Sequence, residues 1–208
     1  DALNNRGIVH QELKDFWSAV NDFNKVLSLK PDDHETLNNR GVVYKELAQY
    51  DESLKDYDKA LSIKPDYAEA YNNRGIVLKE LSRYDEAVAD FDQAILLKPE
   101  YAEPYLNKSL QMLLLGDFSS GWPLYQWRWK IEQNFGKELE TSKPVWQGQR
   151  DASVFLWAEQ GVGDEIMYAS LIPELEKYCS NLTVKCDERL IPLFQRSFSK
   201  GINFQFEQ

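Results

Sequence analysis

The tetrapeptide Asn-Asn-Arg-Gly occupies residues 4–7 and recurs at residues 38–41 and 72–75, each time 34 residues further along the chain. A diverged fourth copy follows at residues 106–109, and proline keeps the same spacing at Pro31, Pro65 and Pro99. Self-similarity at such a period is typical of a solenoid, in which each copy is one unit that packs on its neighbours. The sequence therefore predicts an α-helical solenoid of about four repeats over residues 1–131.

Each repeat divides into two helices, because its apolar and small residues are spaced by three and four positions. The second repeat places Leu37 and Gly41 on a first helix and Tyr57 and Ala60 on a second. Gly41 and Ala60 leave room for the two helices to approach closely, with Tyr57 filling the space beside them. Proline ends the second helix, as at Pro65, because it lacks a backbone donor and disfavours helical geometry in the residue before it.

This pattern resembles the tetratricopeptide repeat (TPR). The resemblance implies stacked helix-turn-helix units that bind a protein or an extended peptide. In the fourth repeat we expect the second helix to begin at Ser119 or Ser120, so that Pro123 falls within or beside its first turn. The family's small, large, small, aromatic, small and proline positions are taken in the third repeat by Gly75, Leu78, Ala87, Phe91, Ala94 and Pro99.

An arginine on the first helix of repeats one to three is followed 16 residues later by an aspartate on the second helix. In the fourth repeat both residues change, to Lys108 and Leu124. This joint loss predicts an ion pair between the two helices of a repeat; independent surface charges are the alternative. The three pairs are Arg6 with Asp22, Arg40 with Asp56 and Arg74 with Asp90.

One polar column survives in all four copies, on the helix expected to line the inner surface of the solenoid. Carboxamides both donate and accept hydrogen bonds, so one per repeat could hold the main chain of an extended peptide whatever its sequence. The alternative is that each asparagine binds the neighbouring repeat. Clamping a terminal carboxylate would need free arginine or lysine, and the arginines are expected to pair with aspartates. The predicted peptide-binding groove contains Asn5, Asn39, Asn73 and Asn107.

The composition limits the possible partners and the compartment. Acidic residues outnumber basic ones 34 to 24, which argues against a nucleic-acid partner. No run of 18 apolar residues is present, so we expect no membrane span. The two cysteines, Cys179 and Cys186, fit neither a zinc site nor a disulfide framework, which favours a reducing, cytoplasmic location. We expect no metal or cofactor in this chain; its oligomeric state is not indicated.

The sequence texture changes near residue 132. Residues 132–150 are predicted to be a linker anchored by Trp146, and residues 151–208 to be the incomplete start of an α/β domain. An apolar run at 154–158 is followed by a glycine loop, a helical pattern from Ile166 to Tyr178, a strand at 182–186, a helix at 190–198 and a strand at 202–206. This order is typical of a mostly parallel, Rossmann-like sheet, where ligands bind at the carboxyl ends of the strands.

The glycine loop differs from a dinucleotide-binding loop. Gly161 and Gly163 are not followed by a third glycine, and Asp164 would repel a pyrophosphate at the start of the helix. An aspartate at the mouth of a cleft can instead accept a proton from a substrate hydroxyl. The alternative is that Asp164 caps the helix while Glu165 complements the helix dipole.

A second resemblance concerns the order of the parts. Repeats, Gly-Trp at 121–122, Tyr-Gln-Trp-Arg at 125–128 and Glu-Gln-Gly-Val-Gly-Asp-Glu at 159–165 resemble bacterial repeat proteins whose second domain is similar to GT-B glycosyltransferases, with heptosyltransferases nearest. The resemblance implies that Asp164 is the general base toward an acceptor hydroxyl, that Gln160, Gly161 and Gly163 form the acceptor loop, and that a nucleotide sugar is the donor. Repeats before a GT-B region also resemble the O-GlcNAc transferase, whose solenoid has an asparagine ladder.

The chain departs from the GT-B pattern in one respect. GT-B enzymes bind the nucleotide sugar mainly through a second Rossmann-like half, and only two or three strands of the first half are expected here. We therefore expect a fragment that binds partners without transferring sugar, from a longer protein that does transfer it. The competing interpretation is an interaction scaffold with a non-catalytic α/β domain.

Overall fold

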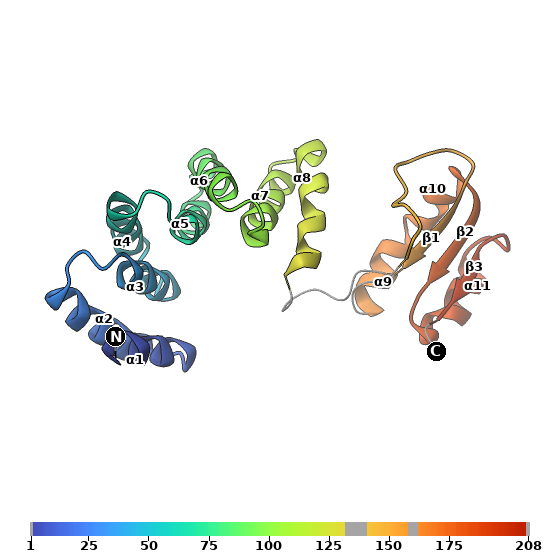
Figure 1. The fold of residues 1–208 in the computed structure, drawn as a ribbon. Helices are drawn as coiled ribbons and strands as arrows, with labels where there is room; N and C mark the ends of the chain where they lie inside the picture. Colours follow the sequence, from blue (N-terminus) through green and yellow to red (C-terminus); the bar gives the residue numbers. More distant parts are fainter. Residues whose placement is uncertain (1, 132–140, 158–161, 207–208) are drawn as a thin grey trace. The chain divides into compact units, whose positions relative to one another are not determined.

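The repeats fold into pairs of antiparallel helices stacked side by side. The computed structural model describes residues 2–131, 141–157 and 162–206 and divides into two compact units, Asp1–Ile131 and Glu132–Gln208. Figure 1 shows the pairs of the first, helical unit in an arc, with α1, α3, α5 and α7 on the inner side and α2, α4 and α6 on the outer side. The pairs are α1 (Ala2–Glu12) with α2 (Phe16–Leu29), α3 (His34–Glu46) with α4 (Tyr50–Ile63), α5 (Ala68–Glu80) with α6 (Tyr84–Leu97), and α7 (Ala102–Leu114) with α8 (Phe118–Tyr125).

A glycine on the first helix lets each of the first three pairs approach closely. A Cβ atom added to Gly41 would lie 2.7 Å from Cε1 of Tyr57, and Tyr57 is fully buried. Gly7 and Gly75 have the same relation to the buried rings of Phe23 and Phe91. The predicted close approach at Gly41 is thus confirmed, and it depends on the missing side chain.

The fourth repeat exchanges the small residues between its two helices. Ser109 stands where the other repeats have glycine, and Gly121 stands on α8 where repeat two has Ser53. The Ser109 hydroxyl donates to the carbonyl of Gly121 at 2.9 Å, and the Ser53 hydroxyl donates to the carbonyl of Gly41 at 2.7 Å. The same helix contact is therefore made with the partners reversed, which preserves the stack although the glycine is lost.

The turn after each first helix uses a left-handed residue at the same place in the repeat. The φ angles are 60° at Lys14, 55° at Ala48, 59° at Ser82 and 80° at Gly116. A left-handed residue after a helix is a common way to satisfy the last carbonyl groups and reverse the chain. Only the fourth repeat uses glycine there, so the usual sequence signal for this turn is missing from the first three.

The expected start of the last helix of this unit is wrong. Helix α8 begins at Phe118, and the Asp117 carboxylate caps it by accepting from the backbone N–H of Ser120 at 3.1 Å. Pro123 therefore lies inside α8, beyond its first turn. Because Pro123 has no N–H to donate to the preceding turn, the helix is short, and the chain continues from Tyr125 as the 3₁₀ helix η1 (Gln126–Lys130).

The second unit contains a three-stranded parallel sheet in the order β1-β2-β3. Its register pairs Val154 with Leu182 and Val184 with Phe204, and these four residues are buried in one core. The elements are β1 (Ala152–Trp157), α9 (Val162–Ala169), α10 (Ile172–Glu176), β2 (Cys179–Lys185), the 3₁₀ helix η2 (Glu188–Leu190), α11 (Ile191–Ser197) and β3 (Asn203–Gln205).

Two expectations for this unit can be compared with its structure. Trp146 packs against the core of the unit and donates from Nε1 to the carbonyl of Gln149 at 2.8 Å, so the end of the predicted linker is anchored there. Residues 132–140 of that linker lie outside the described residues. The single helix expected from Ile166 to Tyr178 is wrong: α9 ends at Ala169 and α10 begins at Ile172, because Pro173 cannot continue a helix but fits at the start of a new one.

Candidate binding surface on the inner helices

The predicted groove asparagines all lie on the inner helices of the arc. Asn5, Asn39, Asn73 and Asn107 belong to α1, α3, α5 and α7 in turn (Figure 1). Asn5 is exposed and the other three are partly buried. The surface formed by these inner helices and their asparagines is called the asparagine surface below.

The asparagines of the last two repeats join neighbouring repeats. Nδ2 of Asn73 donates to Oδ1 of Asn38 at 3.0 Å, and Nδ2 of Asn107 donates to Oδ1 of Asn72 at 2.9 Å. Asn38 and Asn72 each belong to the preceding repeat and are almost completely buried. These bonds agree with the alternative interpretation of the column, in which its asparagines hold the stack together.

The first junction between repeats is made differently. There the Thr36 hydroxyl donates to Oδ1 of Asn4 at 3.1 Å, and the Asn39 amide receives only a long 3.5 Å contact from its neighbour Asn38. At each of these three junctions the first asparagine of the repeated tetrapeptide thus accepts a hydrogen bond from the next repeat. Its role was not predicted from the sequence, although its recurrence at Asn4, Asn38 and Asn72 was a sufficient signal.

Joining the repeats leaves part of each amide available. Asn73 and Asn107 each donate one Nδ2 hydrogen, and their Oδ1 atoms accept no hydrogen bond from the part of the chain that the structure describes. A carboxamide has two donor hydrogens and an acceptor oxygen. Each amide is therefore held in one orientation and still offers a donor and an acceptor to a ligand.

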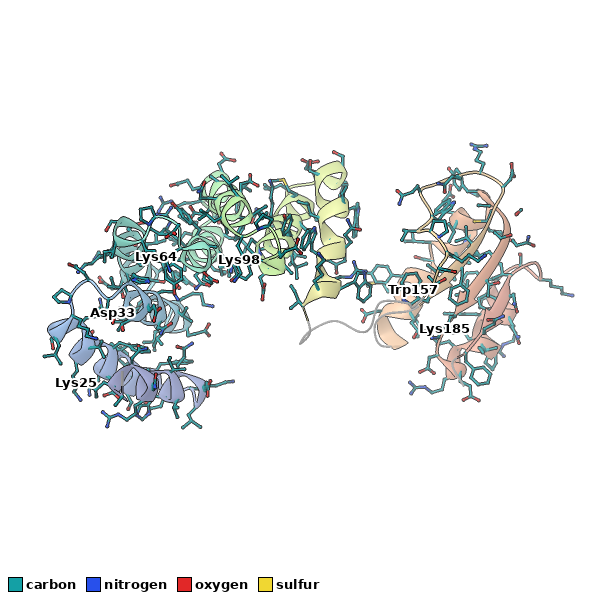
Figure 2. The ribbon with its side chains drawn as sticks, in the orientation of Figure 1. Lys25, Asp33, Lys64, Lys98, Trp157 and Lys185 are labelled. Atoms are coloured by element: carbon teal, nitrogen blue, oxygen red, sulfur yellow. The ribbon has the colours of Figure 1, made fainter. Side chains whose placement is uncertain are left out.

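Tyr101 lies beside Asn72, the partner of Asn107, and Tyr67 holds the same place one repeat earlier. The Tyr101 hydroxyl accepts from Nδ2 of Asn72 at 3.4 Å, and Nζ of Lys98 lies 5.0 Å from the Tyr101 ring centre. Lys98 (labelled in Figure 2) also pairs with Glu69 of α5 at 2.8 Å. Burial, the largest single effect, would raise the pKa of Glu69, but the hydrogen bond from Lys98, a backbone hydrogen bond and the charges of Lys98 and Lys64 together keep that pKa below its ordinary value. Burial raises the pKa of Tyr67 to about 12, so its phenol is a neutral donor at physiological pH.

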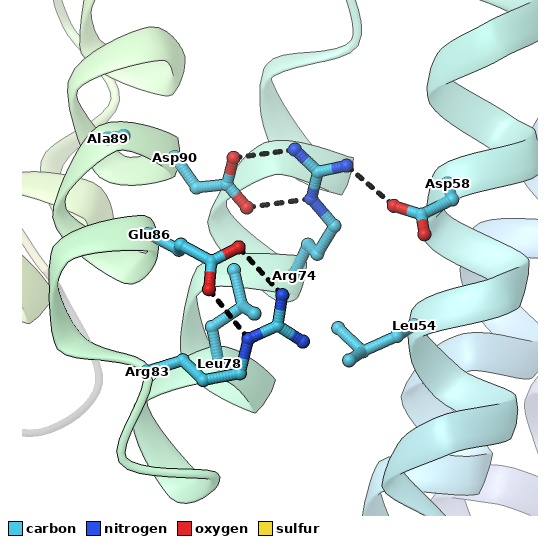
Figure 3. Close-up of a pocket in the computed structure, with 8 residues that line it drawn as sticks. All are labelled: Leu54, Asp58, Arg74, Leu78, Arg83, Glu86, Ala89 and Asp90. Atoms are coloured by element: carbon cyan, nitrogen blue, oxygen red, sulfur yellow. Dashed lines mark hydrogen bonds and ion pairs between the residues drawn. The ribbon is translucent and has the colours of Figure 1, made fainter.

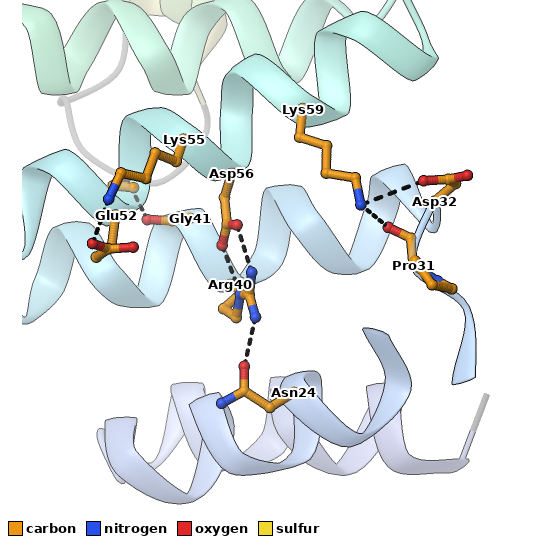
Figure 4. Close-up of polar contacts among 10 residues, drawn as sticks. Asn24, Pro31, Asp32, Arg40, Gly41, Glu52, Lys55, Asp56 and Lys59 are labelled. Carbon is orange, nitrogen blue, oxygen red and sulfur yellow. Dashed lines mark hydrogen bonds and ion pairs between the residues drawn. The ribbon is translucent and has the colours of Figure 1, made fainter. Parts of the chain in front are cut away.

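The predicted ion pairs within repeats are confirmed. Nε and Nη2 of Arg40 donate to the Asp56 carboxylate at 2.7 and 2.6 Å (Figure 4). Arg74 binds Asp90 in the same two-pronged way, at 2.8 and 2.7 Å. Arg6 forms the third pair, and its hydrogen bond keeps the pKa of Asp22 below its ordinary value.

Each cation also reaches back to the preceding repeat, which was not predicted. Nη1 of Arg40 donates to Oδ1 of Asn24 at 2.5 Å, and Nη1 of Arg74 donates to Asp58 at 2.6 Å. Lys108, whose own repeat lacks the aspartate, makes the corresponding bond to Asp92. Asn24, Asp58 and Asp92 lie 16 residues before their cations, so the repeat period contained this signal. Because Arg40 and Arg74 already make these hydrogen bonds, they are not available to bind a terminal carboxylate.

The predicted catalytic loop is only partly described. Asp164 is partly buried in the first turn of α9, shortly after the carboxyl end of β1, and Gly163 precedes it in the same helix. Gln160 and Gly161 lie outside the described residues. Asp164 and Gly163 thus stand at the edge of the sheet where open α/β folds bind ligands.

A hollow of about 490 Å³ lies at this edge, and it contains the neighbour of Asp164. Oε2 of Glu165 accepts from the backbone N–H of Asp187 at 2.8 Å, which joins α9 to the loop after β2. Burial raises the pKa of the Cys186 thiol, in the same wall, to about 11. Asp164 is not among the lining residues, which are Glu165, Lys185, Cys186, Asp187, Glu188, Arg189 and Phe206.

No helix within the described ranges has the length and apolar character needed to cross a bilayer. In the same ranges, no three metal-ligating side chains lie close enough together to hold an ion.

Comparison with known families identifies the helical repeats. A family model described as a tetratricopeptide repeat matches residues 1–33 and 68–101, and one described as a TPR repeat matches residues 46–82. The helical unit is a TPR solenoid. Its irregular fourth pair, α7 and α8, extends beyond the matched segments and keeps the same two-helix packing.

Protein FlbA of Caulobacter vibrioides is 31% identical to the chain over 94 residues, which are 43% of this chain and 16% of FlbA. The match therefore spans only about a sixth of the length of that relative. Among solved structures, the Arabidopsis OM64 TPR domain is 27% identical with a TM-score of 0.51, covering 53% of this chain and 91% of that domain. The second TPR domain of human RPAP3, in complex with the HSP70 peptide SGPTIEEVD, is 22% identical with a TM-score of 0.50, covering 52% and 91%.

Proposed function

We propose that the TPR solenoid binds an extended segment of another polypeptide along the asparagine surface, through hydrogen bonds to its main chain. The observation that supports this most directly is the state of Asn73 and Asn107. Their amides are oriented by the preceding repeat, yet each keeps an acceptor and a donor hydrogen. An extended peptide presents unpaired N–H and C=O groups at regular intervals. Amides that are already oriented lose little side-chain entropy when they bind those groups.

Recognition of the main chain is favoured over recognition of a terminal carboxylate. Arg40 and Arg74 each make three hydrogen bonds within the solenoid, and Lys98 pairs with Glu69. The groups left for a ligand are mainly neutral amides and phenols. We therefore expect weak dependence on the sequence of the bound peptide and little dependence on a free carboxyl end.

The test is a fluorescence-polarisation measurement with fluorescein-labelled peptides of unrelated sequence, each prepared with a free and an amidated carboxyl end. We expect Asn39→Ala with Asn73→Ala to weaken binding of all the peptides by a similar factor, about tenfold or more if two hydrogen bonds are lost. Gln93→Ala is the matched control, because it removes a carboxamide from the outer helix α6. Unchanged affinity in the folded double variant would leave the asparagines with only a structural role.

We propose as a second function that the α/β unit forms the acceptor side of a sugar-transferring enzyme in the full-length protein, with a nucleotide sugar as donor. The support is the parallel sheet and the position of Asp164 near the carboxyl end of β1, where a carboxylate can accept a proton from an acceptor hydroxyl. The two unpaired cysteines favour a cytoplasmic setting.

This second function can be tested by comparing the activities of an Asp164 variant and a Glu165 variant. Nucleotide-sugar hydrolysis or transfer by the full-length protein should be lost in Asp164→Ala. It should be retained in Glu165→Gln, because the amide oxygen can still accept from the Asp187 N–H. Equal activity of Asp164→Ala and the unmodified protein would refute the proposed base. The α/β unit would then be a non-catalytic part of an interaction scaffold.

A further inference from the structure

A hollow of about 390 Å³ lies on the outer side of the solenoid, between the second and third repeats. Its walls come from three helices and the residue before the third: Leu54 and Asp58 of α4, Arg74 and Leu78 of α5, Ala89 of α6, and Arg83, which precedes α6. Figure 3 shows Leu54 facing Leu78 and Arg83 across this space, with Arg74 above them. We refer to it as the outer hollow.

The outer hollow has an apolar floor and a rim of paired charges. Leu54 and Leu78 belong to one hydrophobic cluster, and Leu78 is almost completely buried. Arg74 is fixed by Asp58 and Asp90, as described above. At the exposed rim, Nε and Nη2 of Arg83 donate to the Glu86 carboxylate at 2.7 and 2.6 Å. A ligand for this site therefore needs an apolar body, since the charges around it are already neutralised.

The preceding junction shows what fills the corresponding place. Thirty-four residues earlier, Tyr44 takes the position of Leu78, Lys55 that of Ala89 and Val20 that of Leu54. The Tyr44 ring packs against the cluster that contains Val20, and the guanidinium carbon of Arg40 lies 5.5 Å from the ring centre. In the third repeat Leu78 and Ala89 replace the phenol ring and the lysine side chain, and the ring beside the Arg74 guanidinium carbon is that of Tyr71, 5.6 Å away. The outer hollow is thus the place that an aromatic ring occupies one repeat earlier.

We propose that the outer hollow binds an aromatic side chain of a partner polypeptide, in the place that Tyr44 occupies in its own repeat. The ring packs on Leu54 and Leu78, and the Arg74 guanidinium lies against its face, as Arg40 does with Tyr44. A guanidinium within about 6 Å of a ring centre is attracted to the ring, and Arg40 lies in that range of Tyr44 while it is paired with Asp56. This site is separate from the asparagine surface, since its walls include the outer helices α4 and α6.

The first test is an NMR titration of the 208-residue chain with N-acetyl-L-tyrosinamide as the probe and N-acetyl-L-leucinamide as the control. We expect saturating shifts of the Leu54 and Leu78 methyl signals with tyrosinamide, with a Kd on the order of 1 mM for so small a ligand. Leucinamide should bind at least about fivefold more weakly, because it lacks the ring that a guanidinium attracts. Equal binding of the two probes, or shifts spread over the surface, would overturn the proposal.

Three variants make the test specific, because the second repeat shows that each side chain fits. Leu78→Tyr and Ala89→Lys should each abolish the saturating shifts by filling the outer hollow with the residue that repeat two has there. Tyr44→Leu combined with Lys55→Ala should create a second site, seen as new shifts at Val20. Unchanged tyrosinamide binding in folded Leu78→Tyr, or no new site in the folded Tyr44→Leu, Lys55→Ala double variant, would refute the assignment.

Discussion

One added methyl group at Gly41 should disturb the whole second repeat. The new Cβ would lie 2.7 Å from Cε1 of the buried Tyr57 ring, so α3 and α4 would have to separate. We expect Gly41→Ala to lower the free energy of unfolding by about 1–3 kcal/mol, despite the better helix propensity of alanine. Urea denaturation measures this change in the free energy of unfolding. Gly201→Ala is the control, because its Cβ would come no closer than 3.6 Å to a neighbouring atom; equal effects of the two would contradict the packing argument.

The Cys186 thiol should be almost unreactive in the folded protein. Only the thiolate reacts with an alkylating agent, and burial raises the pKa of this thiol to about 11. At pH 8 about one thiol in a thousand would then be ionised, against about one in ten at an ordinary pKa near 9. Mass spectrometry after iodoacetamide treatment should show Cys186 modified only when denaturant is present. Rapid modification of Cys186 in the native protein at pH 8 would show that the thiol is not shielded.

At the level of the helices, Arg74 pairs with two aspartates whose side chains differ in burial. Asp90 joins α5 to α6 and its side chain is 7% exposed, whereas Asp58 of the preceding repeat is 63% exposed. Removing a partner from a buried pair leaves a charge without compensation, while an exposed pair contributes little. We expect Asp90→Ala to cost about 1–3 kcal/mol of unfolding free energy and Asp58→Ala less than about 1 kcal/mol. Equal losses in urea denaturation would show that the two contacts are equivalent.

The helices were more predictable than their ends. The 34-residue period places every pair in the first unit, and the loss of arginine and aspartate together predicts the ion pairs. The period does not show where a helix stops. Pro173 divides one predicted helix into two, while Pro123 is accommodated inside α8. Proline thus stands at a break between two helices in one unit and inside a short helix in the other, which the residue type alone does not predict.

Which side chains form a candidate site depends on how each helix is rotated about its own axis. The spacing of residues along the chain fixes this rotation only where the helices packed beside it are known. The asparagine column could be placed on the inner helices because all four repeats share one register. Hydrogen bonds to the neighbouring repeat were the alternative expectation, but the period alone does not give the distance between repeats that selects Asn38 and Asn72 as the partners. In the second unit no repeat fixes the rotation of α9, and the structure places Glu165, not Asp164, in the wall of the hollow.

For the molecule as a whole, we expect the helical unit to fold without the rest of the chain. The two units have separate hydrophobic clusters, and solenoid repeats are stabilised by their immediate neighbours. Residues 1–131 alone should show a cooperative loss of helical circular dichroism, at a temperature within a few degrees of the corresponding transition of the full chain. Failure of this segment to fold, or a much lower transition temperature, would mean that its last repeat needs the second unit.

The backward-reaching cations imply a rule for lengthening the array. Asp58 receives Arg74 and Asp92 receives Lys108, so each internal repeat supplies the anion that its successor needs. The fourth repeat has neutral Gln126 at this place, and Leu124 where the others have their own aspartate. A duplicated copy of residues 68–101 would therefore find both of its charge partners inside the stack. Added after Lys130, the same copy would meet the amide of Gln126, as Arg40 meets that of Asn24, so the new junction would keep a hydrogen bond and lose the ion pair.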